Sequence, residues 1–157
     1  MRQRIFGVGN ELRGDDGVGL VVARAAAQRL SAHDVEYLEI GADPLALLAE
    51  LERTDAAVIV DAADMGEEPG AIMALCARDA VRAVRTDPLL CHGFGLKDVL
   101  SIAQEIGILP ERTRIVGIQP LSFEGQGLSP EVRGRLDQYV ETTCNEVLGH
   151  EEEDSRR

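Results

Sequence analysis

Residues 56–64, with the sequence AAVIVDAAD, form an apolar run rich in β-branched side chains that Asp61 interrupts. A strand with one face in water alternates apolar and polar residues, whereas a strand covered on both faces is apolar throughout. Coverage on both faces requires helices above and below the strand, as in the parallel sheets of α/β proteins. The run therefore predicts a central strand of an α/β sheet.

The rest of the chain alternates between strand and helix patterns. Further strands are expected at 4–8, 35–40, 69–76 and 113–120, and helices at 18–30, 43–53, 95–107 and 129–149. This alternation predicts a three-layer α/β sandwich, with a mostly parallel, twisted sheet of about five strands flanked by helices. The pattern does not determine the order of the strands.

Length and charge limit the domain organisation and the partners. A chain of 157 residues fits one domain, which we assign to residues 1–149. The segment HEEEDSRR (150–157) is expected to be an acidic disordered tail. The net charge of −12 argues against a nucleic-acid partner, because phosphate binding uses clusters of Lys and Arg.

Cysteine usage and hydropathy indicate the compartment. The three cysteines are widely spaced, with neither a disulfide framework nor a thiolate zinc motif, as expected in a reducing environment. No signal peptide and no run of about 18 apolar residues is evident. We expect a cytoplasmic protein without a membrane partner, and a monomer because no long apolar stripe is evident.

The segment GVGNELRGDDGVG (7–19) follows the first expected strand and gathers glycines around two aspartates. A dinucleotide fingerprint would need a third glycine at Leu12, and the aspartates would repel a pyrophosphate. Nucleotide binding is therefore disfavoured. Asp15 and Asp16 either cap the following helix or take part in chemistry.

Two other polar residues are expected beyond the carboxyl ends of strands, where open α/β sheets bind ligands. Asp61 ends the central strand, so it either braces a loop or needs a cation. His92, in LLCHGFG (89–95), is either a hydrogen-bonded structural histidine or a ligand. With a carboxylate from the first loop, Asp61 and His92 would suit a divalent transition metal with open positions. The chain lacks a GxSxG serine motif.

Four segments, GVGNELRGDDGVG, VIVDAADMGEEPGAI, CHGFGLKDVL and RIVGIQP, occur in this order between residue 4 and about residue 148. Together they closely resemble the hydrogenase maturation endopeptidases. The resemblance implies a cytoplasmic protease that removes a short C-terminal peptide from the nickel-loaded large-subunit precursor of a [NiFe]-hydrogenase. The alternatives to this protease function are a nickel-recognising maturation chaperone without proteolysis and a metal-dependent hydrolase of small molecules.

The resemblance also assigns residues. The nickel-contacting positions of the family fall on Asp16, Asp61 and His92, which would serve as both metal and catalytic residues, with nickel supplied by the precursor. Many members carry Glu where this chain has Asp16. In this interpretation Asp15 caps and braces the helix start, Asp16 projects into the cleft, and the side chain of Asn10 bonds to the backbone of the loop.

Overall fold

The computed structural model describes residues 1–83 and 95–157, and five strands in these ranges form one sheet. The strands are β1 (Gln3–Val8), β2 (Val35–Gly41), β3 (Ala56–Ala62), β4 (Ile72–Cys76) and β5 (Arg112–Ile118). Their order is β2-β1-β3-β5-β4, and only β4 runs antiparallel to its neighbour. Strand β3 lies at the centre with residues 56–60 buried, so the prediction from the apolar run is confirmed.

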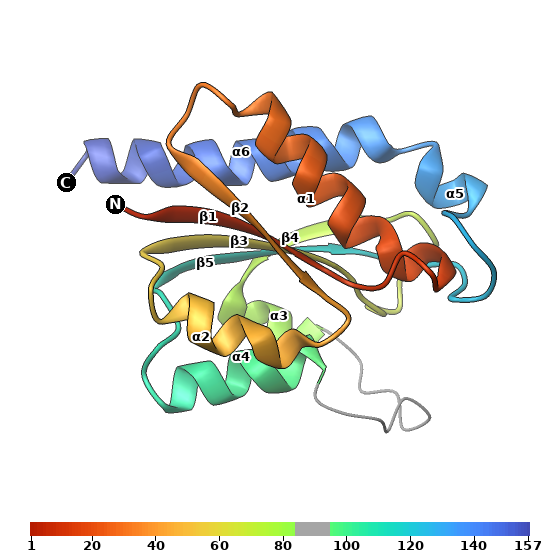
Figure 1. The fold of residues 1–157 in the computed structure, drawn as a ribbon, viewed down its shortest axis with the longest axis horizontal. Coiled ribbons are helices and arrows are strands. Elements are labelled where there is room, and N and C mark those ends of the chain that lie inside the picture. The colour runs from red at the N-terminus through yellow and green to blue at the C-terminus, as the bar shows by residue number, and fades with distance from the viewer. Residues whose placement is uncertain (84–94) are drawn as a thin grey trace.

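Helices cover both faces of the sheet (Figure 1). One face carries α1 (Val18–Arg29), α5 (Pro130–Arg133) and α6 (Leu136–Ser155), and the other carries α2 (Leu47–Leu51), α3 (Ala77–Ala83) and α4 (Leu96–Glu105). Side chains alternate along the strands, so that Ile5 and Val58 face α1 and α6 while Phe6 and Ile59 face α2 and α4. The three-layer α/β prediction is confirmed.

The C-terminal helix differs from the single helix expected at 129–149. The chain forms the short α5, turns at residues 134–135 and then begins α6. Gly134, a poor helix former, lies at the break. At the start of α5, Ser129 does not cap the helix with its side chain, because its hydroxyl donates to Asp15 instead.

The predicted disordered tail at 150–157 is wrong for most of its length, because α6 continues to Ser155. The stop signal expected from Gly149 is overridden by packing. His150 is only 4% exposed and its Nδ1 lies 3.2 Å from Nε2 of Gln3 in β1. Glu151 pairs with His33 at 3.2 Å. Helix α3 was not predicted.

The strand order places a topological switch point at the carboxyl ends of β1 and β3. These strands are neighbours, with Gly7 opposite Val60. The chain leaves β1 toward β2 on one side and leaves β3 toward β4 on the other. Loops that depart in opposite directions leave room between them, which is where open α/β sheets bind ligands.

No helix in the described ranges is long and apolar enough to cross a membrane.

Candidate active site

The beginning of α1 packs directly on the ends of β1 and β3, and Gly19 makes this possible. A Cβ atom at Gly19 would collide with the carbonyl oxygens of Val8 and Val60 and would lie 3.0 Å from Cα of Asp61. Only glycine permits so close an approach of two backbones. The packing brings the loop that precedes α1, which contains Asp16, to the end of β3.

Asp16 is partly buried within a tight turn that closes around it. Its Oδ2 accepts a hydrogen bond of 3.0 Å from the backbone N–H of Asn10. Gly9 has φ +135°, and a Cβ there would collide with the carbonyl oxygen of Asp16. Oδ1 of Asn10 accepts from the N–H of Leu12 at 3.0 Å, as predicted for this side chain. Burial raises the pKa of Asp16, opposed by the positive charge of Arg13 and the N–H of Asn10.

Asp61, at the end of β3, is the more strongly perturbed carboxyl group. Burial raises its pKa well above the ordinary value of 3.8, and the negative charge of Asp16 raises it further against the opposing N–H of Ala62. Neither Asp16 nor Asp61 forms an ion pair with Arg or Lys in the described part of the chain. Two neighbouring, desolvated carboxylates are stabilised by taking up a proton or a cation.

Asp15 has a different environment from Asp16, although the two are adjacent. It is fully buried and accepts four hydrogen bonds, from the N–H groups of Leu121 (2.9 Å), Ser122 (3.3 Å) and Ser129 (2.7 Å) and from the Ser129 hydroxyl (2.8 Å). Burial alone would raise the pKa of Asp15, but these bonds outweigh it and lower the pKa. The predicted capping role is wrong, because the start of α1 has no side-chain cap. Asp15 instead ties the first loop to residues 121–129.

Gln119, at the end of β5, is a positioning residue that sequence reasoning missed. Its Oε1 accepts from the N–H groups of Met65 (2.7 Å) and Glu67 (3.3 Å), and its Nε2 donates to Oδ1 of Asp64 (3.2 Å). These bonds hold the segment after Asp61 against β5. The available signal was a polar residue directly after a buried strand, in GIQP.

The third predicted site residue, His92, lies outside the described residues, as does Cys91. Within residues 1–83 and 95–157, no group of three or more His, Cys, Asp or Glu side chains is placed to hold a metal. The described part of the predicted site is therefore the pair of Asp16 and Asp61, which could supply two oxygen ligands.

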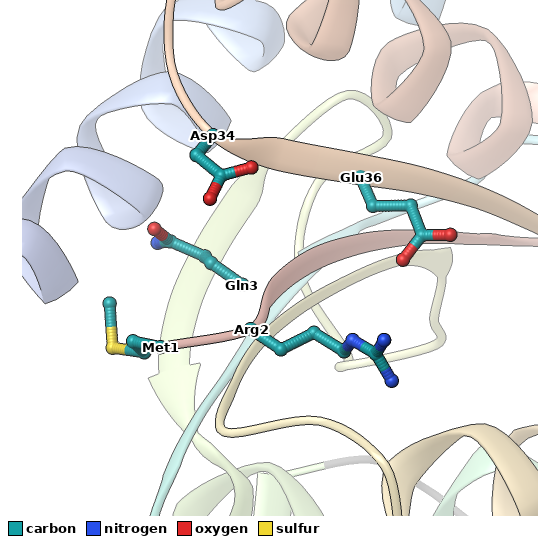
Figure 2. A pocket seen from close by; sticks show the side chains of 5 residues that line it. All are labelled: Met1, Arg2, Gln3, Asp34 and Glu36. Carbon is teal, nitrogen blue, oxygen red and sulfur yellow. The ribbon is translucent and has the colours of Figure 1, made fainter.

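An open pocket of about 330 Å³ lies at the opposite edge of the sheet (Figure 2). Its lining comes from the start of β1 and from the beginning of β2, and consists of Met1, Arg2, Gln3, Asp34 and Glu36. Glu36 already pairs with the buried Arg4 at 2.8 Å. None of the predicted site residues lines this pocket, and it lies at the amino ends of the strands. The carboxyl edge is therefore the better candidate for chemistry.

Comparison with known proteins identifies the family of this chain. Residues 20–146 match the family model described as hydrogenase maturation protease. This chain belongs to the hydrogenase maturation protease family. The matched range begins after Asp16 and includes Asp61 and His92.

Individual relatives of this maturation protease extend the match. The chain is 32% identical to the hydrogenase 2 maturation protease of Escherichia coli K12 over 143 residues, covering 90% of this chain and 87% of the relative. It is 32% identical to the hydrogenase expression/formation protein HupD of Rhodobacter capsulatus over 149 residues, covering 93% and 71%.

Solved structures share the fold. The hydrogenase maturating endopeptidase HybD from E. coli has a TM-score of 0.74 and 30% identity, covering 90% of this chain and 89% of that one. The [NiFe] hydrogenase maturation protease HycI from Thermococcus kodakarensis KOD1 has a TM-score of 0.71 and 27% identity, covering 93% and 92%. The predicted family and fold are confirmed, and the protein is a peptidase of hydrogenase maturation.

Proposed function

We propose that this maturation protease removes a short C-terminal peptide from the large-subunit precursor of a [NiFe]-hydrogenase once nickel has been inserted. In this proposal Asp16, Asp61 and His92 contact the nickel that the precursor carries. The observation that carries the proposal is the pair Asp16 and Asp61, two neighbouring carboxyl groups from separate elements whose pKa values are both raised by burial. The monomeric state of the enzyme and its location in the cytoplasm stay predictions.

The contrast with Asp15 supports a cation as the missing partner. Asp15 is compensated by four hydrogen bonds from the protein, whereas Asp16 accepts one within residues 1–83 and 95–157, from Asn10. Carboxylate oxygens together with an imidazole nitrogen suit divalent transition metals, nickel among them. A metal that arrives with the precursor would compensate the negative charge only in the complex, so cleavage would depend on prior nickel insertion.

The proposed hydrolysis uses the same residues. A water molecule polarised by the metal attacks the carbonyl carbon of the scissile peptide bond. One of the two carboxylates takes the proton of this water and delivers it to the nitrogen of the leaving peptide. The rigid ends of β1 and β3 hold the carboxylates in place, because catalytic groups need fixed positions.

The test is intact-protein mass spectrometry of a nickel-loaded large-subunit precursor incubated with the enzyme. We expect loss of one C-terminal peptide with the wild type, and no loss with Asp16→Ala, with His92→Ala or from nickel-free precursor. Asp55→Asn is the matched control, because Asp55 lies beside the opposite end of β3, where it accepts from the N–H of Arg2 at 2.6 Å.

The remaining outcomes separate the alternatives. Nickel-dependent binding with an unchanged precursor mass would support a maturation chaperone and overturn the protease proposal. Equal cleavage of nickel-loaded and nickel-free precursor would support proteolysis but overturn the role of nickel. If the enzyme neither binds nor cleaves the precursor, the proposed substrate is overturned.

A further inference from the structure

Three exposed large apolar side chains lie at the edge of the sheet that holds the two carboxylates. Within residues 1–83 and 95–157 the exposed large apolar side chains are Met1, Leu12, Leu45, Ile106 and Leu121. Leu12, Leu45 and Leu121 follow the carboxyl ends of β1, β2 and β5. Leu12 and Leu121 are 74% and 51% exposed. An exposed apolar group beside a candidate active site is a feature of binding surfaces.

Leu12 and Leu121 lie on two loops that Asp15 joins. The N–H of Leu121 donates to Oδ2 of Asp15, next to Asp16, at 2.9 Å. The loops also contact through a cation–π pair, with the guanidinium carbon of Arg13 lying 5.5 Å from the centre of the Phe123 ring. We call Leu12, Leu121 and the Arg13–Phe123 pair the apolar rim.

Backbone hydrogen bonds hold both leucines in place while their side chains face water. The N–H of Leu12 is bonded to Oδ1 of Asn10 at 3.0 Å, and that of Leu121 is bonded to Asp15. A side chain presented on an ordered backbone loses less conformational freedom on binding than one on an unordered loop. The rim is thus preorganised for a ligand.

We propose that the apolar rim binds an apolar side chain of the precursor, in the extended segment beside the scissile bond. This inference rests on the proposed function and deepens it by naming a specificity surface. An extended peptide advances about 3.3 Å per residue. Leu12 is four residues from Asp16, and Leu121 is bonded to the neighbour of Asp16. In this proposal, a peptide whose scissile bond lies beside Asp16 and Asp61 reaches the rim within about four residues of that bond.

A second copy of this chain is a less suitable occupant. A stable interface between two folded proteins buries about 1,000 Å² or more, which two leucines and one stacked ring do not supply. A single peptide segment needs only a small apolar contact, because its main affinity in this proposal comes from the metal site. The rim then selects the correct segment and its direction.

The experiment compares Leu12→Ser and Leu121→Ser with Ile106→Ser, a matched control. Ile106 is 61% exposed and lies at the end of α4, before the amino end of β5. We expect KM for nickel-loaded precursor to rise about 10-fold in each leucine variant, with kcat within about twofold of wild type. Ile106→Ser should match the wild type in both. Leucine variants that behave like Ile106→Ser would overturn the inference.

Affinity for the nickel-loaded precursor, measured by calorimetry for the same variants, separates the two proposals. If the wild type does not cleave, the proposed function fails. In that case, weaker binding by the two leucine variants but not by Ile106→Ser would still support binding of the precursor at the rim. Equal binding by all variants would overturn it. Thermal unfolding of each variant checks that these exposed substitutions leave the fold unchanged.

A substitution in the precursor sharpens the result. Apolar residues within four positions of the cleaved bond are changed to Ser one at a time and tested against wild type and Leu12→Ser. If one of them contacts the rim, its effect on KM should largely disappear in Leu12→Ser, because both changes remove the same contact. Additive effects at every position would contradict the contact.

Discussion

The amino and carboxyl edges of the sheet differ in the partners that they provide for buried charged groups. At the amino edge, the side chain of Arg4 is 7% exposed and its guanidinium pairs with Glu36 at 2.8 Å and with Glu50 at 3.0 Å. At the carboxyl edge, Asp61 is left beside a second carboxyl group, and its pKa is raised. Leaving a buried charge uncompensated lowers stability. In the proposed function this edge is where the peptidase does its chemistry, because perturbed carboxyl groups cluster at functional sites.

The same contrast occurs between adjacent residues of one loop. Asp15 is fully buried and satisfied by four donors from residues 121–129. From the described residues, Asp16 accepts one hydrogen bond, donated by the N–H of Asn10. The number of donors that reach each carboxylate distinguishes the one that supports the structure from the one that is available to a ligand.

The largest effect is expected from Asp61→Asn, which removes a carboxylate that has no Arg or Lys partner among the described residues and keeps the shape of the side chain. We expect cleavage of nickel-loaded precursor to fall about 1,000-fold, or about 4 kcal/mol in activation free energy. The free energy of unfolding should stay the same or rise, because the buried charge is gone. Single-turnover cleavage and urea unfolding measure the two quantities.

Asp55→Asn, beside the other end of the same strand, is the control and should cleave normally. Normal cleavage by Asp61→Asn would contradict the assignment of Asp61. A large loss of stability in that variant would show that Asp61 is structural, like Asp15.

Asp15→Ala should cause the next largest effect, on stability. It leaves three N–H groups and the Ser129 hydroxyl without their acceptor, and we expect the free energy of unfolding to fall by about 3 kcal/mol. Asp43→Ala is the control, because exposed Asp43 accepts the N–H of Leu45, at 3.0 Å, and its loss should cost about 1 kcal/mol. Urea unfolding of both variants measures the difference. Equal losses would contradict a bracing role for Asp15.

Much of the fold could be predicted from local sequence. The apolar run before Asp61 indicated a covered central strand, and β3 is central. Asp43 and Pro44 indicated a helix start, and Asp43 does accept the N–H of Leu45. The strand order could not be predicted, because no local pattern reports which strands are neighbours. The extension of α6 past Gly149 depends on contacts of His150 with Gln3, which is distant in sequence.

The candidate site was also predictable only in part, because some of its contacts join residues that are distant in sequence. Asp16 and Asp61 follow strands, so the rule for parallel sheets places them at one edge, and the structure brings them together. The role of Asp15 was wrong because its partners lie more than 100 residues away, at Leu121, Ser122 and Ser129. His92 as a ligand stays a prediction.

Arg4→Met tests the amino edge and should have a smaller effect than Asp15→Ala. Glu36 and Glu50 remain partly in water, with 53% and 34% of their side chains exposed, so losing Arg4 does not strand a fully buried charge. We expect about 1 to 2 kcal/mol of lost stability and unchanged cleavage. Arg24→Met, with its side chain 47% exposed, should cost about 0.5 kcal/mol or less. Impaired cleavage in Arg4→Met at unchanged stability would contradict the division between the two edges.

The smallest effect is expected from the pH dependence that His150 confers. Burial lowers the pKa of His150 below 6.5, opposed by Glu153 and Glu146 and supported by the positive charges of Arg112 and Arg114. The unfolded state therefore binds the proton more readily than the folded state. The stability that burial of neutral His150 contributes is present above pH 6.5 and is lost as the pH falls through 6.5 toward the pKa of the folded state.

The measurement is the urea midpoint between pH 5 and pH 8 for wild type, His150→Gln and His33→Gln. The wild type and His33→Gln, whose substituted side chain is exposed, should both lose stability as the pH falls below 6.5. His150→Gln should lose less over the same interval, because it cannot take up the proton. A parallel loss in all three proteins would mean that His150 titrates alike in the folded and unfolded states, and that the end of α6 does not bury it against Gln3.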